Sequence, residues 1–133
     1  MSEGEDALWF WRHARTALSA ARRTLDIDAS TASNRAYYAA FYAVSALFAA
    51  EGRTFRGHSG VEAAVHRDLV RAGRWSEDLG TAFGELHRLR MTADYDVSTF
   101  PSVEEAQEAV RQAKMIVEAV RDACPELNQS EPS

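Results

Sequence analysis

The sequence predicts an all-α protein, an antiparallel up-and-down bundle of four to five helices. Three observations support this fold class. Apolar residues recur three and four positions apart along most of the chain, and neither an alternating strand pattern nor an internal repeat is present. The segment 36–50, AYYAAFYAVSALFAA, contains no charged residue, Pro or Gly. A helix that is apolar on nearly every side must be covered by other helices or by a second subunit, so we expect this segment at the centre of the bundle.

Length and composition limit the classes of protein to which the chain can belong. Its 133 residues suffice for one domain with a substantial core, and we expect a helical domain at 7–123 between a disordered start at 1–6 and a polar tail at 124–133. The single cysteine, Cys124, excludes an intrachain disulfide and a cysteine zinc site. No Gly-rich phosphate loop is present either, so neither a cofactor nor a metal is expected.

Charge and hydropathy favour a cytoplasmic protein that does not enter the membrane. The acidic start of the chain lacks the basic stretch of a signal peptide. The apolar segment 36–50 is shorter than the roughly 20 residues needed to cross a bilayer. A formal net charge of −5 argues against nucleic-acid binding through bulk attraction alone. Residues 7–50 nevertheless carry five Arg against two Asp, so a local basic site is compatible with the sequence.

The first helix is expected to begin near Asp6 and to direct one apolar stripe toward the core. Four basic residues lie off this stripe and are interpreted as a solvated face, with a binding surface as the alternative. The stripe consists of Trp11, Ala14, Leu18, Ala21 and Leu25, and the basic residues are Arg12, Arg15, Arg22 and Arg23.

Helix ends are predicted from caps and breakers. The second helix should run from about 31 to 50 and stop at Gly52. The third should begin at Ser59, which has the spacing of a capping box with Glu62, and should end at Gly73. Further signals are a cap at Ser76 for the fourth helix, a second capping box of Ser102 with Glu105 for the fifth, and a stop at Pro125.

Arg90 lies on the apolar stripe of the fourth helix, between Leu86 and Ala93. A charge in that position is costly unless it is paired, and Asp94 lies one helical turn further on. Arg90 could be a phosphate clamp that Asp94 orients, with Tyr95 as a stacking platform, a proton donor or a hydroxyl that a partner modifies. Alternatively, Arg90 and Asp94 form a structural ion pair, and Tyr95 closes the core.

Three short motifs resemble the HEPN superfamily, in particular its small stand-alone prokaryotic members. They are Asn34-Arg35-Ala36-Tyr37-Tyr38-Ala39, His58-Ser59-Gly60 and Arg90-Met91-Thr92-Ala93-Asp94-Tyr95. The resemblance covers about 7–123 and implies a helical bundle that often dimerises, with a functional groove near the fourth helix. It also implies a nucleotide- or RNA-associated member of a toxin–antitoxin-like or defence module, paired with a minimal nucleotidyltransferase.

Other members of that superfamily are metal-independent endoribonucleases built on an Arg and a His with four to six residues between them. Here Arg90 is followed at that distance by Tyr95, Asp96 and Val97. An endoribonuclease is therefore the alternative function, with Arg90 acting together with Asp94, Tyr95 or His58. A helical scaffold without catalytic activity is the second alternative.

The candidate catalytic residues are thus Arg90, Asp94 and Tyr95. The candidate nucleotide- or RNA-binding residues all lie in or near the first two motifs, and they are Asn34, Arg35, Tyr38, His58 and Ser59. Structural interpretations are also open: a helix cap or a hydrogen bond to the chain at the helix start for Asn34, an ion pair with an acid for Arg35, packing or a dimer interface for the rings, and a loop hydrogen bond for His58. A homodimer is expected from the apolar surface of the central helix and the Trp-rich start of the first.

Overall fold

The computed structural model describes residues 3–95 and 100–130, and the secondary structure in these ranges is helical. The long helices are α1 (Glu3–Thr24), α2 (Ala29–Ala50), α4 (Glu77–Tyr95) and α5 (Val103–Ala123). The short helix α3 (His58–Ala64) continues into the π-helical turn η1 (Val65–Val70), and the 3₁₀ helix η2 (Pro125–Ser130) follows α5. The predicted all-α bundle is confirmed.

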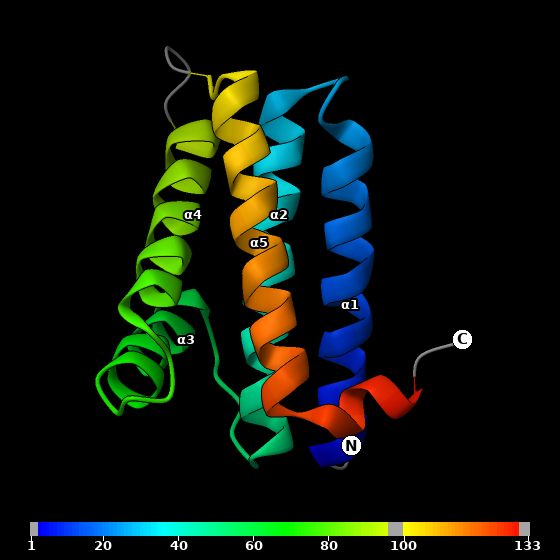
Figure 1. Ribbon diagram of the computed structural model, residues 1–133, viewed down its shortest axis with the longest axis vertical. Coiled ribbons are helices and arrows are strands. Elements are labelled where there is room, and N and C mark those ends of the chain that lie inside the picture. Colours follow the sequence, from blue (N-terminus) through cyan, green and yellow to red (C-terminus); the bar gives the residue numbers. More distant parts are fainter. Residues whose placement is uncertain (1–2, 96–99, 131–133) are drawn as a thin grey trace.

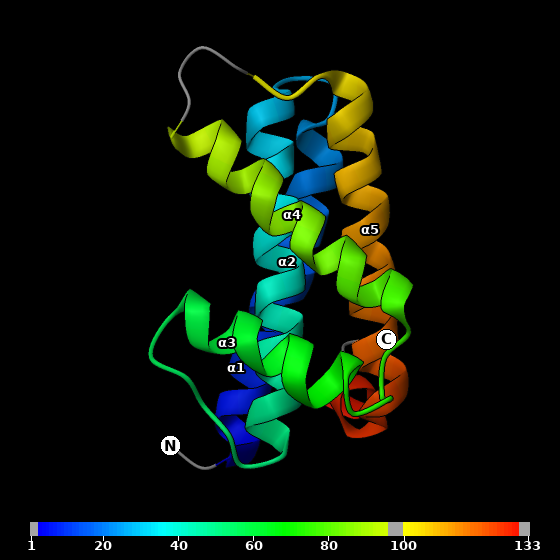
Figure 2. The same ribbon diagram turned by 90° about the vertical axis from the view of Figure 1, so that its left-hand side faces the viewer.

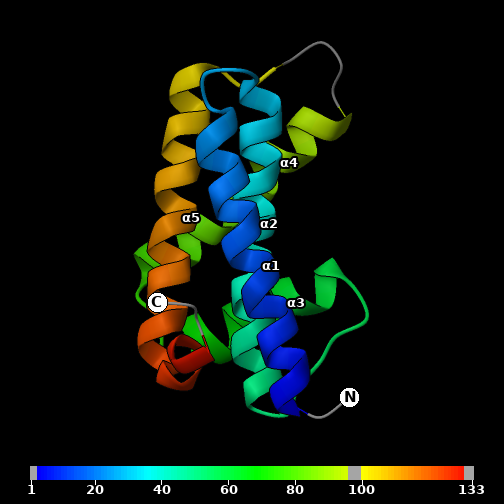
Figure 3. The ribbon, with the colours of Figure 1, turned by 90° about the vertical axis from the view of Figure 1, so that its right-hand side faces the viewer.

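The long helices alternate in direction, as in an up-and-down bundle (Figure 1). Helix α2 lies at the centre and packs against α1, α4 and α5. Figure 2 shows that α4 crosses α2 and α5 obliquely. In the same view, α3 lies below α4. Helices α1 and α4 therefore lie on opposite sides of α2 and α5 (Figures 1 and 3).

The composition of α2 explains its central position. Its small residues Ala39, Ala40 and Ala43 are fully buried, so neighbouring helices can approach its backbone closely. Tyr37 and Phe48 are fully buried as well and fill the space between helices. Burial on several faces is what the uncharged segment 36–50 requires.

Most of the predicted helix ends are confirmed. Gly52 has a positive φ of 82° just after α2, where a residue with a Cβ would be strained. The Ser76 hydroxyl accepts a hydrogen bond from the Leu79 amide at the start of α4. At the start of α5, Ser102 and Glu105 form both hydrogen bonds of a capping box.

The predicted capping box of Ser59 and Glu62 is wrong. Helix α3 begins at His58, and its N-cap is Gly57, which makes no side-chain capping bond. Ser59 lies inside the first turn, and the Glu62 carboxylate instead contacts side chains of α2 and α4. The Asn34 cap is also wrong, because Asp28 caps α2 through the Ser30 amide.

Both ends of the described chain are more ordered than the sequence suggests. Helix α1 begins at Glu3, three residues before the expected start; residues 1 and 2 lie outside the described residues. The described part of the polar tail forms η2, in which Leu127 is buried, because an apolar side chain there can pack under α1 and α5. Among the described helices, none combines the length and hydropathy that crossing a bilayer demands.

Candidate functional site

Polar side chains from three helices meet where α3 and α4 approach the first half of α2. Helix α2 contributes two neighbouring tyrosines, α3 a His and a Glu one turn apart, and α4 a His and an Arg three positions apart. We call this group the Arg90 cluster, and it consists of Tyr37, Tyr38, His58, Glu62, His87 and Arg90.

A line of short contacts joins the three helices within the Arg90 cluster. The Tyr37 hydroxyl lies 2.8 Å from His58 Nδ1 and donates to Glu62 Oε1 at 3.3 Å. The same carboxylate oxygen lies 2.8 Å from His87 Nδ1. An ionised carboxylate only accepts hydrogen bonds. The Tyr37 proton therefore points toward Glu62, His58 donates from Nδ1, and Nε2 of His58 is left as the nitrogen that can accept a proton.

The Arg90 guanidinium lies over the two tyrosine rings. Its central carbon is 5.3 Å from the ring centroid of Tyr37 and 5.5 Å from that of Tyr38. These are distances at which a cation is attracted by the face of an aromatic ring. This packing explains how a charged residue occupies the apolar stripe of α4. The predicted ion pair with Asp94 stays a prediction, because the Asp94 side chain lies outside the described residues.

Burial and charge set the protonation states in the Arg90 cluster. Burial, assisted by the Glu62 carboxylate, raises the pKa of the Tyr37 hydroxyl far above its usual range, so Tyr37 remains a proton donor. Burial and the nearby positive charge of Arg90 lower the pKa of His58 below its ordinary value of 6.5. His58 is therefore a neutral imidazole at pH 7, the form that accepts a proton.

A groove lined by aromatic and basic residues opens beside His58. It has a volume of about 190 Å³. Phe41 stacks on the His58 ring with centroids 4.3 Å apart, and Phe10 and Phe55 line the groove further along. Its basic residues, Arg53 and Arg56, come from the loop between α2 and α3. Aromatic faces combined with basic side chains are the features with which proteins bind single-stranded nucleic acid.

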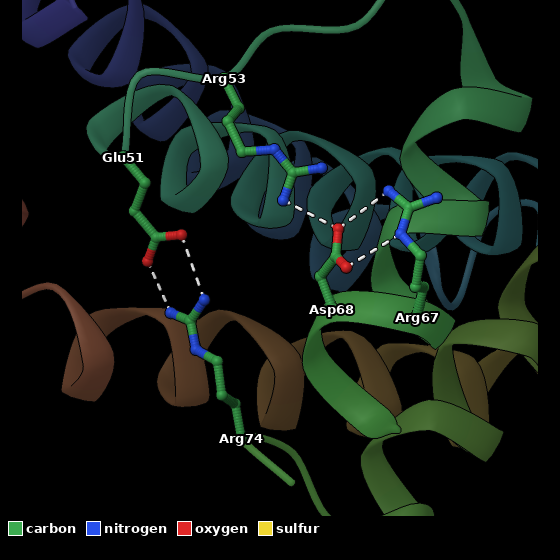
Figure 4. A network of polar contacts seen from close by, with 5 residues as sticks. All are labelled: Glu51, Arg53, Arg67, Asp68 and Arg74. Atoms are coloured by element: carbon green, nitrogen blue, oxygen red, sulfur yellow. Dashed lines mark hydrogen bonds and ion pairs between the residues drawn. The ribbon is translucent and has the colours of Figure 1, made fainter. Parts of the chain in front are cut away.

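Ion pairs hold that loop in place (Figure 4). Arg53 lies 2.8 Å from Asp68 Oδ2, and Arg67 lies 2.9 Å from Oδ1 of the same carboxylate. Next to them, Arg74 donates two hydrogen bonds to Glu51. The Arg67 and Arg53 guanidinium groups lower the pKa of Asp68 to about 2. Because the loop leads directly into α3, these pairs help to place His58.

The structure brings some of the predicted site residues together. Tyr38, His58 and Arg90 meet in the Arg90 cluster. Arg35 joins its edge, with its guanidinium 4.9 Å from the Tyr38 centroid, and donates to Asn34 Oδ1 rather than to an acid. Among the described residues, no acid forms the predicted ion pair with Arg35. Ser59 is exposed at the start of α3. Asp94 and Tyr95 belong to the last turn of α4, and their side chains lie outside the described residues.

Three residues of the Arg90 cluster were absent from the predicted site. They are Tyr37, Glu62 and His87, of which Glu62 was expected only as part of a capping box. Helix spacing was the available signal, because His87 is three positions before Arg90 and Glu62 is four after His58.

In the described ranges, no three His, Cys, Asp or Glu side chains are grouped so that they could hold a metal ion.

Comparison with known proteins identifies the family. The family model of the HEPN domain matches residues 7–123, nearly the whole chain. The chain belongs to the HEPN domain family. A UPF0332 protein of Thermotoga maritima is 34% identical over 132 residues, which cover 98% of this chain and all of that protein. A protein of Methanocaldococcus jannaschii named "Putative toxin MJ0605" is 31% identical over 93 residues, 70% of this HEPN chain and 69% of the relative.

Proposed function

We propose that this HEPN protein is the toxin-like component of a toxin–antitoxin-like or defence module, and that the Arg90 cluster acts on RNA or a nucleotide. The observation that carries the proposal is the position of His58, which contacts Tyr37 within the Arg90 cluster and also lines a groove of phenylalanines and arginines. Arg90 would bind a phosphate, and the groove would hold a base by stacking. The relative from Methanocaldococcus jannaschii is named a toxin, and this name supports the toxin-like part of the proposal.

The proposal includes a nucleotidyltransferase as partner. It rests on the three sequence motifs, each of which contributes to the Arg90 cluster. Affinity isolation of the tagged protein from its native host, followed by mass spectrometry, tests this part. A nucleotidyltransferase recovered in stoichiometric amount is the expected result. Recovery of the protein alone, at an abundance where a partner would be seen, would contradict it.

A homodimer is also proposed, and the apolar end of α1 supports it. Trp9 is 45% exposed although it is a large apolar ring, and it packs edge-on against Phe10 and Tyr42. Large aromatic side chains at a surface are typical of protein interfaces. Sedimentation analysis of the wild type and Trp9→Ser tests this: a dimer that the substitution weakens is expected, and a monomeric wild type at micromolar concentration contradicts it.

Metal-independent cleavage of RNA is the second candidate function, and the two histidines of the Arg90 cluster favour it. Neutral His58 would take the proton of a 2′-hydroxyl through Nε2, and the 2′-oxygen would attack the adjacent phosphorus. The bond from phosphorus to the 5′-oxygen would break, and His87, which lies against Glu62, would give that oxygen a proton. Arg90 would stabilise the charge on the phosphoryl oxygens. The products would be a 2′,3′-cyclic phosphate and a 5′-hydroxyl.

Incubation of the purified protein with mixed RNA in EDTA tests this second candidate. Cleavage by the wild type that is lost in Arg90→Ala and in His58→Gln is expected, with Arg71→Ala on the exposed surface as the control. Circular dichroism confirms that the variants fold. Absence of cleavage by the wild type would reject catalysis by this chain alone. If Arg90→Ala lowered stability and changed nothing else, the Arg90 cluster would be structural and the chain a scaffold.

A further inference from the structure

A basic groove lies between α1 and α5, away from the Arg90 cluster. It has a volume of about 360 Å³. A shallower hollow on α1, lined by Arg12, Arg15 and Arg23, adjoins it. The groove itself is lined by Arg15, Leu18, Ser19, Arg22, Lys114, Val117, Glu118 and Arg121.

The charge of this surface is opposite to that of the whole chain. Together the groove and the hollow hold six of the fifteen Lys and Arg residues but one of the twenty Asp and Glu residues. That acid, Glu118, lies 4.0 Å from Lys114. On a protein with a formal net charge of −5, this surface is a local site of positive charge, which attracts a polyanion at short range.

The spacing of the basic residues suits a chain of phosphates better than a single anion. Arg15 and Arg22 on α1 are seven positions apart, as are Lys114 and Arg121 on α5, which corresponds to about 10 Å along each helix. The two helices run in opposite directions (Figure 3), so each end of the groove has basic residues from both walls. A single phosphate cannot reach both ends, whereas a nucleic-acid backbone can.

The groove lacks the features of a protein interface or a membrane surface. Among the residues whose burial the structure describes, the exposed large apolar side chains are Trp9, Ile27, Met91, Phe100 and Val103, and none of them lines the groove. Aromatic anchors dominate protein interfaces, and a membrane-bound helix buries apolar side chains. Guanidinium groups beside the hydroxyls of Thr16 and Ser19 are instead groups that bind phosphate oxygens.

We propose that the α1–α5 groove binds the backbone of single-stranded RNA. The groove runs between the neighbouring helices α1 and α5, and a positively charged groove that follows one backbone is typical of proteins that bind single strands. Helix α4 lies on the other side of α2 and α5 (Figure 1), so this surface anchors RNA without forming part of the Arg90 cluster. The inference does not require the Arg90 cluster to be catalytic.

Fluorescence anisotropy with a labelled 20-nucleotide 2′-O-methyl oligouridine tests the proposal, because this RNA cannot be cleaved through a 2′-hydroxyl. The test variant is Arg15→Gln with Arg22→Gln. The control is Arg71→Gln with Arg88→Gln, which removes the same charge from other exposed positions. We expect binding by the wild type, a roughly tenfold loss in the test variant, and a salt dependence reduced by about 1.4 logarithmic units per decade, since two phosphate contacts are lost.

Each alternative has a distinct result. Equal affinity of the test and control variants would overturn the proposal, as would no binding at all. Polyglutamate that competes as well as oligouridine would assign the groove to an acidic protein, and a preference for duplex RNA would reject the single strand. Loss of binding in Arg90→Ala but not in the test variant would place the RNA at the Arg90 cluster instead. RNA binding by the wild type that is lost in the test variant, together with no growth arrest when the wild type is expressed, would leave the groove established and the proposed function rejected.

Discussion

The hydroxyl of Tyr37 lies 2.8 Å from Nδ1 of His58, although 21 positions separate the two residues in the sequence. Tyr37 is fully buried in α2, and His58 is the first residue of α3. The contact fixes the histidine ring relative to the rigid centre of the bundle. It also connects the core to the groove beside the Arg90 cluster, because the His58 side chain lines that groove.

Replacing Tyr37 with Phe removes this contact and keeps the ring. We expect the free energy of unfolding to fall by about 1–2 kcal/mol, since His58 and Glu62 lose a buried hydrogen-bond partner. Chemical denaturation followed by circular dichroism measures the change. Tyr42→Phe, at the edge of the same helix, should cost less. Equal losses in the two variants would show that the Tyr37 hydroxyl has no particular structural role.

Stability should depend on the protonation of His58. Its pKa is lowered in the folded protein by burial and by Arg90, so the unfolded chain binds a proton more readily. As the pH falls below the ordinary value of 6.5, this difference lowers the free energy of unfolding, and above that value the effect is absent. Denaturation at pH 7.5 and 5.5 should therefore show a larger loss for the wild type than for His58→Gln. An equal or smaller loss in the wild type would contradict the assignment.

Two charge changes should move the pKa of His58 in opposite directions. Arg90 lowers this pKa and Glu62 raises it, because a nearby cation disfavours the imidazolium and an anion favours it. Arg90→Gln should thus raise the pKa of His58, and Glu62→Gln should lower it further. Titration of the histidine ring by NMR checks both signs. Shifts of the same sign in both variants would mean that the described arrangement is not the one in solution.

The ion pairs of Asp68 should protect the loop that leads to His58. Asp68→Asn weakens the contacts with Arg53 and Arg67, so we expect faster trypsin cleavage after Arg53 and Arg56 at unchanged helix content. Asp122→Asn on the exposed surface of α5 serves as the control. Cleavage at the wild-type rate would show that the loop is held by the packing of Phe55 against Phe48 rather than by charge.

Local sequence patterns predicted the bundle because helix ends and apolar stripes depend on interactions between residues that are close in sequence. The capping box of Ser102 and Glu105 and the positive φ of Gly52 involve neighbours in sequence, and both are confirmed. Where a tertiary contact competes, prediction failed. Glu62 has the spacing of a cap but contacts Tyr37 and His87, and the helix that follows it continues as the π-helical turn Val65–Val70.

The candidate site was predictable only in part for the same reason. Arg90 could be singled out because a charge interrupts an apolar stripe, and its environment over the Tyr37 and Tyr38 rings explains how it is accommodated. The spacing of His87 from Arg90 indicates only a shared face of α4, because its partner Glu62 comes from another helix. No local spacing predicts that α3 and α4 bring two histidines to one tyrosine of α2.

Growth of bacteria that express the protein from an inducible promoter tests the central claim, that the Arg90 cluster makes this HEPN protein toxin-like. Wild type, Arg90→Ala and the control Arg71→Ala are compared at protein levels matched by immunoblot. We predict that the wild type and Arg71→Ala arrest growth, whereas cells with Arg90→Ala grow like cells without the protein. Arrest by Arg90→Ala equal to that of the wild type, or no arrest by the wild type, would contradict the account.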